Sequence, residues 1–443
     1  MRNIPPLDHH FAPFGQYLTS YLNSTHIPLN IGIERDENNM SVHKTFIRGT
    51  GEDLQFIERV VKTLLWIKGG YKVTIYGDPR IADFLRGCYR KGGAREFDYM
   101  FMSKIYEKEF RVCCEPIENT PGEKEQRTAI GRNRLGCRIG FDAGGSDRKV
   151  SAVVNGKALY SEEVLWLPKE NDDPQYHFDG IVSSLKTAAS KMPRVDSIGV
   201  SSAGIYVNNR TMAASLFIKV PEDKFDQQVK DIYIRAAREI GDLPLTVVND
   251  GDVTALAGAR DLKSGCVLGI AMGTSEAGGY VDKSKCITGW LNELAFVPVD
   301  MNPRAAEDEW SGDRGCGVKY FSQDAVIRLA LAGKINFPEG LTPAGKLQYV
   351  QELMDKRDPV ARDVFRSVGC YLGHTVPLYA MFYDIRHVIL LGRVMSGKGG
   401  NLILSTAQSV LETEYPELAG QINLCLPSEK SRRVGQSVTA AGL

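Results

Sequence analysis

The sequence lacks the features that mark several large classes of protein. Its 54 lysines and arginines are balanced by 54 aspartates and glutamates, so no net basic charge attracts nucleic acid or an anionic membrane. No apolar run approaches the ~20 residues that span a bilayer. The first residues, MRNIPPLDHHFAPFGQ, contain no apolar signal core. We therefore expect a cytoplasmic protein that contacts neither membranes nor nucleic acid.

Cysteine is sparse and shows no pattern. The nine cysteines include one adjacent pair, Cys113 and Cys114, and no CxxC motif. An odd count without a framework indicates reduced thiols, as in the cytoplasm. The apolar fraction of 43% and charged fraction of 24% are ordinary for a globular protein. At 443 residues the chain is too long for one hydrophobic core, so we expect two or three domains.

The N-terminal third has its own pattern of helices and strands. The composition of residues 1–30 is irregular, which predicts an N-terminal arm or packed extension without regular secondary structure. Strands are predicted in LNIGIER, SVHKTFIR and YKVTIY, and a helix over 53–68 that Gly69 ends. Residues 1–118 are therefore predicted to form a small α/β module of unknown role.

A polar stretch separates this module from the rest of the chain. Residues 119–136 are charged and contain glycine, which predicts a linker. Arg132 and Arg134 within it could touch a phosphate, but a solvated linker is the simpler interpretation.

Beyond the linker, short strands that end in glycine or polar turns alternate with helices. Helices are predicted near 180–191 and over 225–240, and the last residues, 433–443, form a small-residue helix. This pattern predicts an α/β fold in two lobes. The first lobe would span 137–250 and the second 251–443, with the C-terminal helix returning to the first lobe.

The stretch at 139–154, IGFDAGGSDRKVSAVV, predicts a hairpin. Its glycine pair, Gly144 and Gly145, permits backbone torsions that a Cβ would forbid, so an anion could approach the main chain beside Asp142 and Ser146. An ordinary hairpin with a glycine turn has the same pattern, so this stretch alone does not decide the function.

Two further stretches belong with the hairpin. Asn249 and Asp250 follow a predicted strand, and Gly273-Thr274 precedes the pair Gly278-Gly279. Glycine-rich backbone, a hydroxyl, a carboxylate for Mg²⁺ and a base are what phosphoryl transfer requires. Each part also has a structural interpretation: Asp142 could cap a turn, Asp250 a helix, and the second glycine pair a bulge. The ordered set favours a phosphate site.

From about residue 137 the chain resembles the ROK family of sugar kinases and repressors, in the actin-like ATPase superfamily. GFDAGGS is similar to the family's first phosphate motif, VVNDGDVTALAGA to its catalytic run, AMGTSEAGGYV to its second phosphate motif and NELAFV to a sugar-binding segment. The resemblance implies a two-lobed actin-like ATPase (ribonuclease H-like) fold. It also implies a general base, Asp250, and the sugar contacts Asn249, Glu293 and Ser215. The implied nucleotide and phosphate contacts are Asp142 (through Mg²⁺), Gly144, Gly145, Ser146, Gly273, Thr274, Gly278, Gly279 and Gly392.

Several positions depart from the family pattern. Of the family's zinc ligands only Cys316 is in register, with Glu309, Ser311 and Phe296 at the other positions, so no structural zinc is expected. Val318 replaces an acidic sugar contact, and Ser215 stands where the family has asparagine. Glu276 interrupts the second phosphate loop, where its charge would repel a triphosphate. Beside Gly392, Arg393 and Val394 break the adenosine motif.

These observations predict an ATP-dependent kinase that uses Mg²⁺ and acts on a hydroxyl of a sugar or sugar derivative. The alternative is a non-catalytic sugar- or nucleotide-binding protein, possibly regulatory. A repressor would carry a helix-turn-helix in residues 1–115, and the strand pattern there disfavours it. We also expect a homo-oligomer, specifically a dimer.

Overall fold

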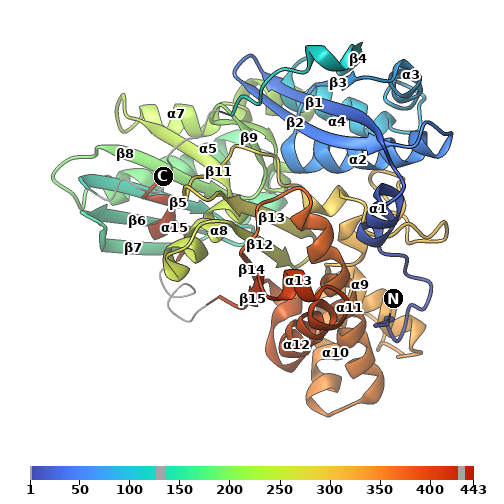
Figure 1. Cartoon of the computed structure of the whole chain (residues 1–443). Helices are drawn as coiled ribbons and strands as arrows, with labels where there is room; N and C mark the ends of the chain where they lie inside the picture. Colours follow the sequence, from blue (N-terminus) through green and yellow to red (C-terminus); the bar gives the residue numbers. More distant parts are fainter. Residues whose placement is uncertain (1, 126–134, 428–434) are drawn as a thin grey trace. The chain divides into compact units, whose positions relative to one another are not determined.

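A computed structural model describes residues 2–125, 135–427 and 435–443. The chain forms two compact units (Figure 1). Unit 1 consists of Met1–Gln126, Ile270–Gly278 and Trp290–Leu426, and unit 2 of Arg127–Gly269, Gly279–Gly289 and Pro427–Leu443. Residues 126–134 of the predicted linker, with Arg132 and Arg134, lie outside the described residues. The predicted division into a module, a linker and two lobes stays a prediction.

The N-terminal part of unit 1 is built on a sheet with strand order β2-β1-β3-β4. β1 pairs antiparallel with β2 and β3, and β3 pairs parallel with β4. The elements are α1 (Phe14–Leu22), β1 (Ile27–Asp36), β2 (Asn39–Ile47), α2 (Glu52–Lys68), β3 (Lys72–Tyr76), α3 (Pro79–Cys88), α4 (Glu96–Tyr106) and β4 (Arg111–Glu115). The predicted α/β character of this region is confirmed.

The prediction that residues 1–30 are irregular is wrong for α1. Phe14, Leu18 and Tyr21 recur at helical spacing and are buried, which stabilises a helix despite the flanking prolines and asparagines. The helix predicted at 53–68 is confirmed as α2. Gly69, with φ of +77°, ends α2 where a side chain would be strained.

The C-terminal part of unit 1 is mainly helical. It contains α9 (Gln323–Ala332), α10 (Pro343–Asp355), α11 (Pro359–Ala380), α12 (Gly397–Glu414) and α13 (Pro416–Ala419). α11 and α12 pack closely because Gly373 brings α11 against Val410, where a Cβ would lie 2.5 Å from the valine Cβ. Four strands, in the order β13-β12-β14-β15, form a second sheet. They are β12 (Val267–Met272), β13 (Glu276–Val281), β14 (His387–Leu391) and β15 (Asn423–Cys425). Residues 270–272 of β12 and 276–278 of β13 belong to unit 1, and the rest of these two strands to unit 2.

Unit 2 is built on a sheet with strand order β11-β8-β5-β6-β7. β8 pairs parallel with both β5 and β11. β6 pairs antiparallel with both β5 and β7. The strands are β5 (Cys137–Ala143), β6 (Asp147–Val154), β7 (Lys157–Leu165), β8 (Ser197–Ser202) and β11 (Leu245–Asn249), with a separate pair, β9 (Ile205–Val207) and β10 (Arg210–Ala213). The helices are α5 (Pro174–Ala189), α6 (Glu222–Lys224), α7 (Ile232–Arg238), α8 (Asp250–Leu262) and α15 (Gln436–Ala440).

The two faces of β5 have different neighbours. Ile139, Phe141 and Ala143 belong to the hydrophobic core of unit 2. Side chains alternate along a strand, so Gly140 and Asp142 lie on the opposite face. There a Cβ on Gly140 would lie 1.7 Å from the Ser437 carbonyl oxygen, which shows how closely α15 packs against this face.

Two helix predictions in unit 2 need correction. The helix expected near 180–191 begins earlier, at Pro174, because the Asp173 side chain accepts a hydrogen bond from the backbone N–H of Gln175 and caps it. The single helix expected over 225–240 is broken: a π-helical turn covers Phe225–Val229, and α7 begins only at Ile232.

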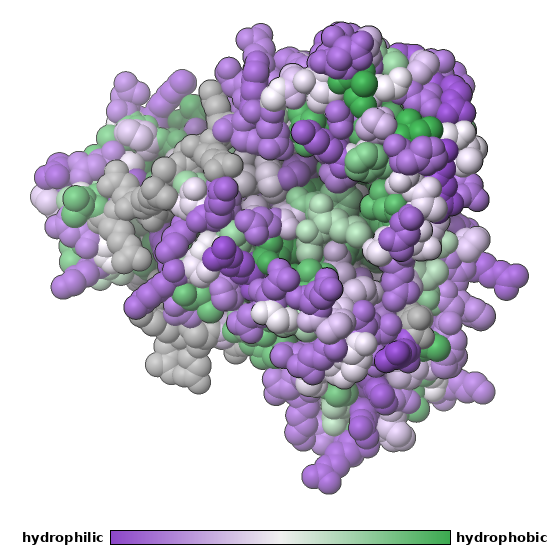
Figure 2. Space-filling model, viewed as in Figure 1, coloured by the Kyte–Doolittle hydropathy of each residue, from purple (hydrophilic) through white to green (hydrophobic). Residues whose placement is uncertain are grey.

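The surface is mostly polar. Figure 2 shows hydrophilic residues over most of the face in view, with apolar residues between them. Within the described ranges, none of the helices is both long enough and apolar enough to cross a bilayer.

Candidate active site

The first glycine turn joins β5 to β6 in unit 2, as the hairpin prediction required. The backbone N–H of Gly144 donates to the Asp147 carbonyl oxygen (3.0 Å). A Cβ at Gly144 would lie 2.7 Å from that oxygen, so the turn requires glycine there. Gly145 and Ser146 are exposed. Backbone at the tip of this turn is therefore open to an anion.

Two lysines lie at this turn. Lys149, opposite Asp142 in the hairpin, places its Nζ 3.4 Å from Asp147 Oδ1. A Cβ on Gly145 would lie 3.6 Å from Lys169 Nζ. Sequence reasoning missed Lys169, because the polar run PKENDD shows no sign that its lysine returns to the turn. Together the lysines supply positive charge where a phosphate would meet the glycine backbone.

Asp142 and Asp250 influence each other electrostatically in unit 2. Burial raises the pKa of Asp142 to about 6, and the negative charge of Asp250 contributes to the rise. Burial also raises the pKa of Asp250. Two carboxylates that share a site are destabilising unless a cation or a proton is bound there.

Asn249, and not Asp250, caps helix α8. The Asn249 Oδ1 accepts from the Gly251 N–H (2.7 Å), and its Nδ2 donates to the Gly204 carbonyl oxygen (2.7 Å). The interpretation of Asp250 as a helix cap is therefore wrong, since Asp250 is the first residue inside the helix. The role of Asn249 as a sugar contact stays a prediction.

A buried hydroxyl network lies beside Asp250. Tyr206 donates to Ser202 Oγ (2.6 Å), which also bonds the Tyr233 hydroxyl (2.9 Å). Burial raises the pKa of Tyr206 well above its ordinary value, and the charge of Asp250 adds to it. Sequence reasoning did not single out Tyr206, although it follows the glycine turn after β8.

Gly279 has a packing role in unit 2. A Cβ there would lie 2.1 Å from the Gly251 carbonyl oxygen, and the Tyr280 N–H donates to Asp252 Oδ1 (3.1 Å). β13 therefore packs directly on the start of α8. This contact explains the glycine without a phosphate, and nucleotide binding by Gly279 stays a prediction.

The second phosphate loop lies in unit 1 at the end of β12. The Gly273 N–H donates to Ser275 (3.0 Å), and its carbonyl oxygen accepts from Gln323 (2.8 Å). A Cβ on Gly273 would make only an ordinary contact, 3.8 Å from the Ser275 carbonyl oxygen, and Thr274 is exposed. Gly392, with φ of +97°, follows β14 and lies so close to Met272 that a Cβ would meet the Met272 carbonyl oxygen at 2.3 Å.

Glu276 does not place a charge in this loop, which corrects the interpretation above. The residue is 2% exposed at the start of β13, whereas Ser275, just before the strand, is exposed. Burial raises the pKa of Glu276 to about 8, so the acid is mostly neutral at pH 7. The Tyr379 hydroxyl donates to its Oε1 (3.3 Å).

The N-terminal module positions the segment with Glu293. The N–H groups of Asn292 and Glu293 donate to the carbonyl oxygens of Ile67 (3.0 Å) and Trp66 (2.9 Å) at the end of α2. These carbonyls belong to the last turn of a helix, where partners within the helix are missing. Gly278 packs there too, since a Cβ would lie 2.6 Å from the Asn292 carbonyl oxygen.

The remaining candidate residues are Ser215 and Val318. Ser215 is exposed at the start of a 3₁₀ turn in unit 2. Val318 lies in unit 1, where its carbonyl oxygen accepts from Ser322 (2.6 Å). Sugar binding by Ser215 stays a prediction.

The residues at the family's zinc positions do not fit a zinc ion. Cys316 is the one cysteine at these positions, and burial raises the pKa of its thiol to about 12. Lys319 binds Glu309 (2.8 Å), and Phe296 packs on Trp66 with ring centroids 4.2 Å apart. In the described part of the chain, no cluster of three or more His, Cys, Asp or Glu side chains could hold a metal.

A buried cluster of charged side chains, and not a zinc ion, holds the loop around residue 313. We define this charge cluster as Glu58, Arg59, Lys62, Arg95, Asp98 and Asp313. Asp313 pairs with Arg59 (2.9 Å), Arg95 (2.9 Å) and Lys62 (3.3 Å), and Asp98 pairs with Lys62 (3.0 Å). Burial opposes the charge of Lys62, yet its acidic neighbours raise its pKa. The charge cluster ties the N-terminal module to the loop around residue 313.

A model of the ROK family matches residues 138–420, well over half of the chain, and the chain therefore belongs to the ROK family. No curated protein matches the chain. The family match begins at residue 138, so the N-terminal module lies outside it.

Solved structures of ROK proteins have a similar fold. A ROK family glucokinase from Streptomyces griseus, in complex with glucose and AMPPNP, is 22% identical, with a TM-score of 0.51 over 69% of this chain and 98% of that chain. The ROK hexokinase from Thermus thermophilus is 19% identical, with a TM-score of 0.52 over 69% and 98%. A ROK family transcriptional regulator, a homologue of the E. coli MLC protein, is 16% identical, with a TM-score of 0.51 over 70% and 78%. The predicted actin-like ATPase fold is thus confirmed.

Proposed function

We propose that this protein is an ATP-dependent kinase that phosphorylates a hydroxyl group of a sugar or sugar derivative. The observation that carries the proposal is the pair Asp142 and Asp250, two carboxylates that interact beside an exposed glycine turn with two lysines. Like charges held together do not serve stability, and perturbed carboxylates of this kind mark functional sites.

The proposed roles follow from this chemistry. Asp250 accepts the proton of the attacking hydroxyl, for which its raised pKa suits it. Asp142 has the carboxylate oxygens that Mg²⁺ prefers and would hold the ion, which when bound offsets phosphate charge. The backbone of Gly144, Gly145 and Ser146 faces phosphate. The further proposed contacts are Gly273, Thr274, Gly278, Gly279 and Gly392 for the nucleotide and Asn249, Glu293 and Ser215 for the sugar.

A non-catalytic sugar- or nucleotide-binding role is the second candidate. Val318 in place of an acidic sugar contact, and the charge cluster in place of zinc ligands, favour it. Binding to DNA is not favoured, because the described N-terminal module is organised around a four-stranded sheet rather than a helix-turn-helix.

The two candidates can be separated with the full chain, a carbohydrate panel and Mg-ATP. Thermal shifts report binding, since a ligand at a hundred times its dissociation constant adds about 2.7 kcal/mol. A kinase is stabilised by a sugar and by Mg-ATP, and releases ADP only when both are present. Sugar stabilisation without ADP release would favour the binding protein. No response to nucleotide with any sugar would overturn the kinase proposal.

A further inference from the structure

A cavity of about 120 Å³ lies in unit 1, and none of its lining residues is among those assigned to phosphoryl transfer. Its walls come from β1, β2, the end of α2 and the residues after α11. It is lined by Ile31, Ile33, Ser41, Val42, His43, Leu64, Lys68, Glu123, Met381 and Phe382. A dry cavity of about 150 Å³ can hold benzene. The pocket therefore has room for a compact group of about half a dozen heavy atoms.

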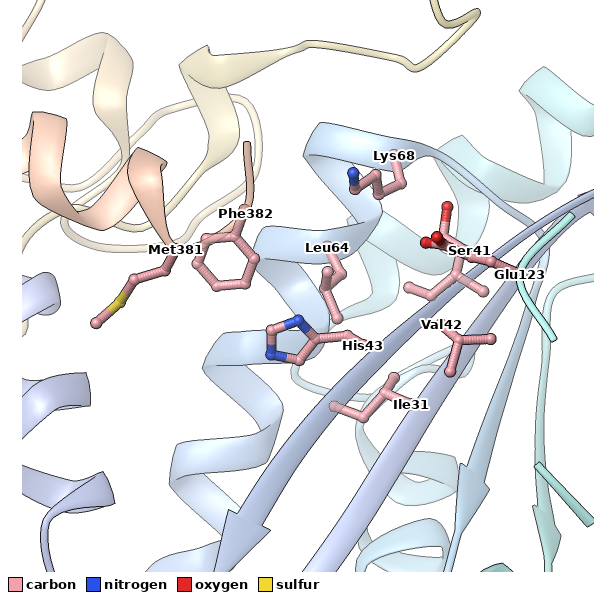
Figure 3. Close-up of a pocket in the computed structure, with 10 residues that line it drawn as sticks. Ile31, Ser41, Val42, His43, Leu64, Lys68, Glu123, Met381 and Phe382 are labelled. Carbon is pink, nitrogen blue, oxygen red and sulfur yellow. The ribbon is translucent and has the colours of Figure 1, made fainter. Parts of the chain in front are cut away.

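Six of the ten lining residues have apolar side chains, and polar groups of Ser41, His43, Lys68 and Glu123 make up the rest of the wall. Figure 3 shows Leu64 and His43 between the Lys68 amine and the side chains of Ile31 and Val42, with Phe382 to the left of His43 and Leu64. The His43 ring stacks on Phe382, with centroids 5.3 Å apart. Burial lowers the pKa of His43 to about 4, with the charge of Lys68 adding to the effect. His43 is therefore neutral and adds no positive charge to the wall.

Lys68 is buried without a close counter-ion. Its residue is 7% exposed, and its Nζ lies 2.9 Å from the centroid of the Trp290 ring. Among the residues that the structure describes, no carboxylate is within ion-pair distance of this amine. Burial lowers its pKa to about 7; Glu125 and Glu123 oppose that effect, and Arg35 adds to it. Burial thus increases the share of Lys68 that is a neutral, nucleophilic amine at pH 7, while the Trp290 ring face favours the ammonium form.

The nearby acidic groups argue against an anionic ligand. The Glu125 carboxylate is occupied by Arg35, by the Ser41 hydroxyl (2.7 Å) and by the Trp290 indole N–H (3.3 Å). Glu123 is exposed at the edge of the pocket, where it repels anions. An uncharged ligand with an electrophilic atom matches the amine and its apolar surroundings better than a carboxylate or phosphate does.

We propose that this pocket binds small aldehydes or ketones with a compact apolar body, and that Lys68 captures them as an imine. The nitrogen lone pair forms a bond to the carbonyl carbon, and a proton moves from nitrogen to oxygen. The carbon–oxygen bond of this carbinolamine then breaks, and the oxygen leaves as water with the second amine proton. One C=N bond replaces one C=O bond and one water is released, so no oxidant or reductant is needed.

The test exposes the full chain to 2-methylpropanal with sodium cyanoborohydride, which reduces an imine to a stable amine, followed by peptide mass mapping. Lys68 should be modified at least tenfold faster than the other lysines, with a rate that rises through about pH 7. Modification spread over lysines in proportion to their exposure would overturn the proposal.

Three variants complete the test. Lys68→Met should lose the fast adduct. Lys72→Arg is the matched control, because Lys72 lies four residues away, paired with Glu34 (3.0 Å), and the Lys68 adduct should persist. Val42→Phe fills the pocket while keeping the amine and should slow labelling, which decides the matter if Lys68→Met does not fold. If 2-methylpropanoate protects the wild type against heat and the aldehyde gives no adduct, the site binds anions and the imine proposal fails.

Discussion

The charge cluster in unit 1 and the carboxylate pair in unit 2 are both withdrawn from solvent, but their charges are arranged differently. The cluster combines the cations Arg59, Lys62 and Arg95 with carboxylates that each contact one or more of them. In unit 2, Asp142 and Asp250 have the same sign and raise the energy of one another's charged form. The charge cluster holds the fold of unit 1 together. The like charges of Asp142 and Asp250 are favourable only if a cation or a substrate binds beside them.

Replacing the proposed base should have the largest effect. Asp250→Asn keeps the shape of the side chain and removes its ability to take a proton, so turnover should fall by about two to four orders of magnitude. Sugar binding and the melting temperature should change little. Sugar-dependent ADP release, measured beside thermal shifts, checks this expectation.

The matched control for this variant is Asp242→Asn, an exposed carboxylate in the same unit, which should keep full turnover. If Asp250→Asn were as active as the wild type, the proposed mechanism would be wrong. The carboxylate pair in unit 2 would then have no catalytic role that distinguishes it from the charge cluster in unit 1.

Breaking the charge cluster should instead affect stability. Asp313→Asn removes the carboxylate that Arg59, Lys62 and Arg95 share. Each cation keeps Glu58 or Asp98, so the loss of stability should be about 3 kcal/mol, at the low end of the cost of breaking a buried ion pair. Urea unfolding should report this loss. Glu307→Gln, which breaks the exposed pair with Arg314 in the same loop, should cost less than about 1 kcal/mol. Equal losses in the two variants would show that the cluster is not a structural substitute for a metal.

Glu276 tests whether unit 1 also keeps buried acids neutral. Its pKa is raised in the folded state to about 8 from an ordinary 4.5. Its contribution to stability is therefore complete below about pH 4.5 and is lost as the pH rises through about 8. Over that window the contribution falls by about 1.4 kcal/mol per pH unit. Glu276→Gln should remove this slope, so the variant should gain stability relative to the wild type as the pH rises.

Urea unfolding from pH 5 to 8 measures the difference. Glu309→Gln, at an exposed carboxylate of the same unit, should keep the wild-type slope. Parallel curves for the wild type and Glu276→Gln would mean that Glu276 is ionised in the folded state, and that a charge does lie beside the second phosphate loop.

Much of the fold and part of the candidate site could be predicted from local sequence. The hairpin with Asp142, the strand before Asp250 and the helix ending at Gly69 each depend on neighbouring residues and their spacing. The burial of Glu276 depends on the packing around β13, and the hydrogen bond from Asn249 Nδ2 to the Gly204 carbonyl oxygen depends on contacts across the fold. Neither leaves a local signal.

Contacts between distant segments account for the rest. Asp313 meets Arg59 across 254 residues of sequence, and Lys68 lines a pocket with Phe382. No spacing rule connects such positions, because the chain topology brings them together. The residues that could be predicted are those whose chemistry and backbone conformation are both determined by neighbours a few residues away in the sequence.

The smallest predicted effect concerns Lys169, which lies at the first glycine turn although its loop is distant in sequence from Gly145. If the turn binds phosphate, Lys169→Met should raise the KM for ATP by about tenfold and leave kcat nearly unchanged, as expected for a charge that binds phosphate equally in the ground and transition states. Lys169→Arg should recover most of the affinity, because the positive charge is kept. Lys219→Met, whose amine contacts the Glu170 carbonyl oxygen (3.4 Å), is the matched control and should change neither constant. An unchanged KM for Lys169→Met would mean that the exposed backbone of the turn, without this lysine, provides the anion contact in unit 2.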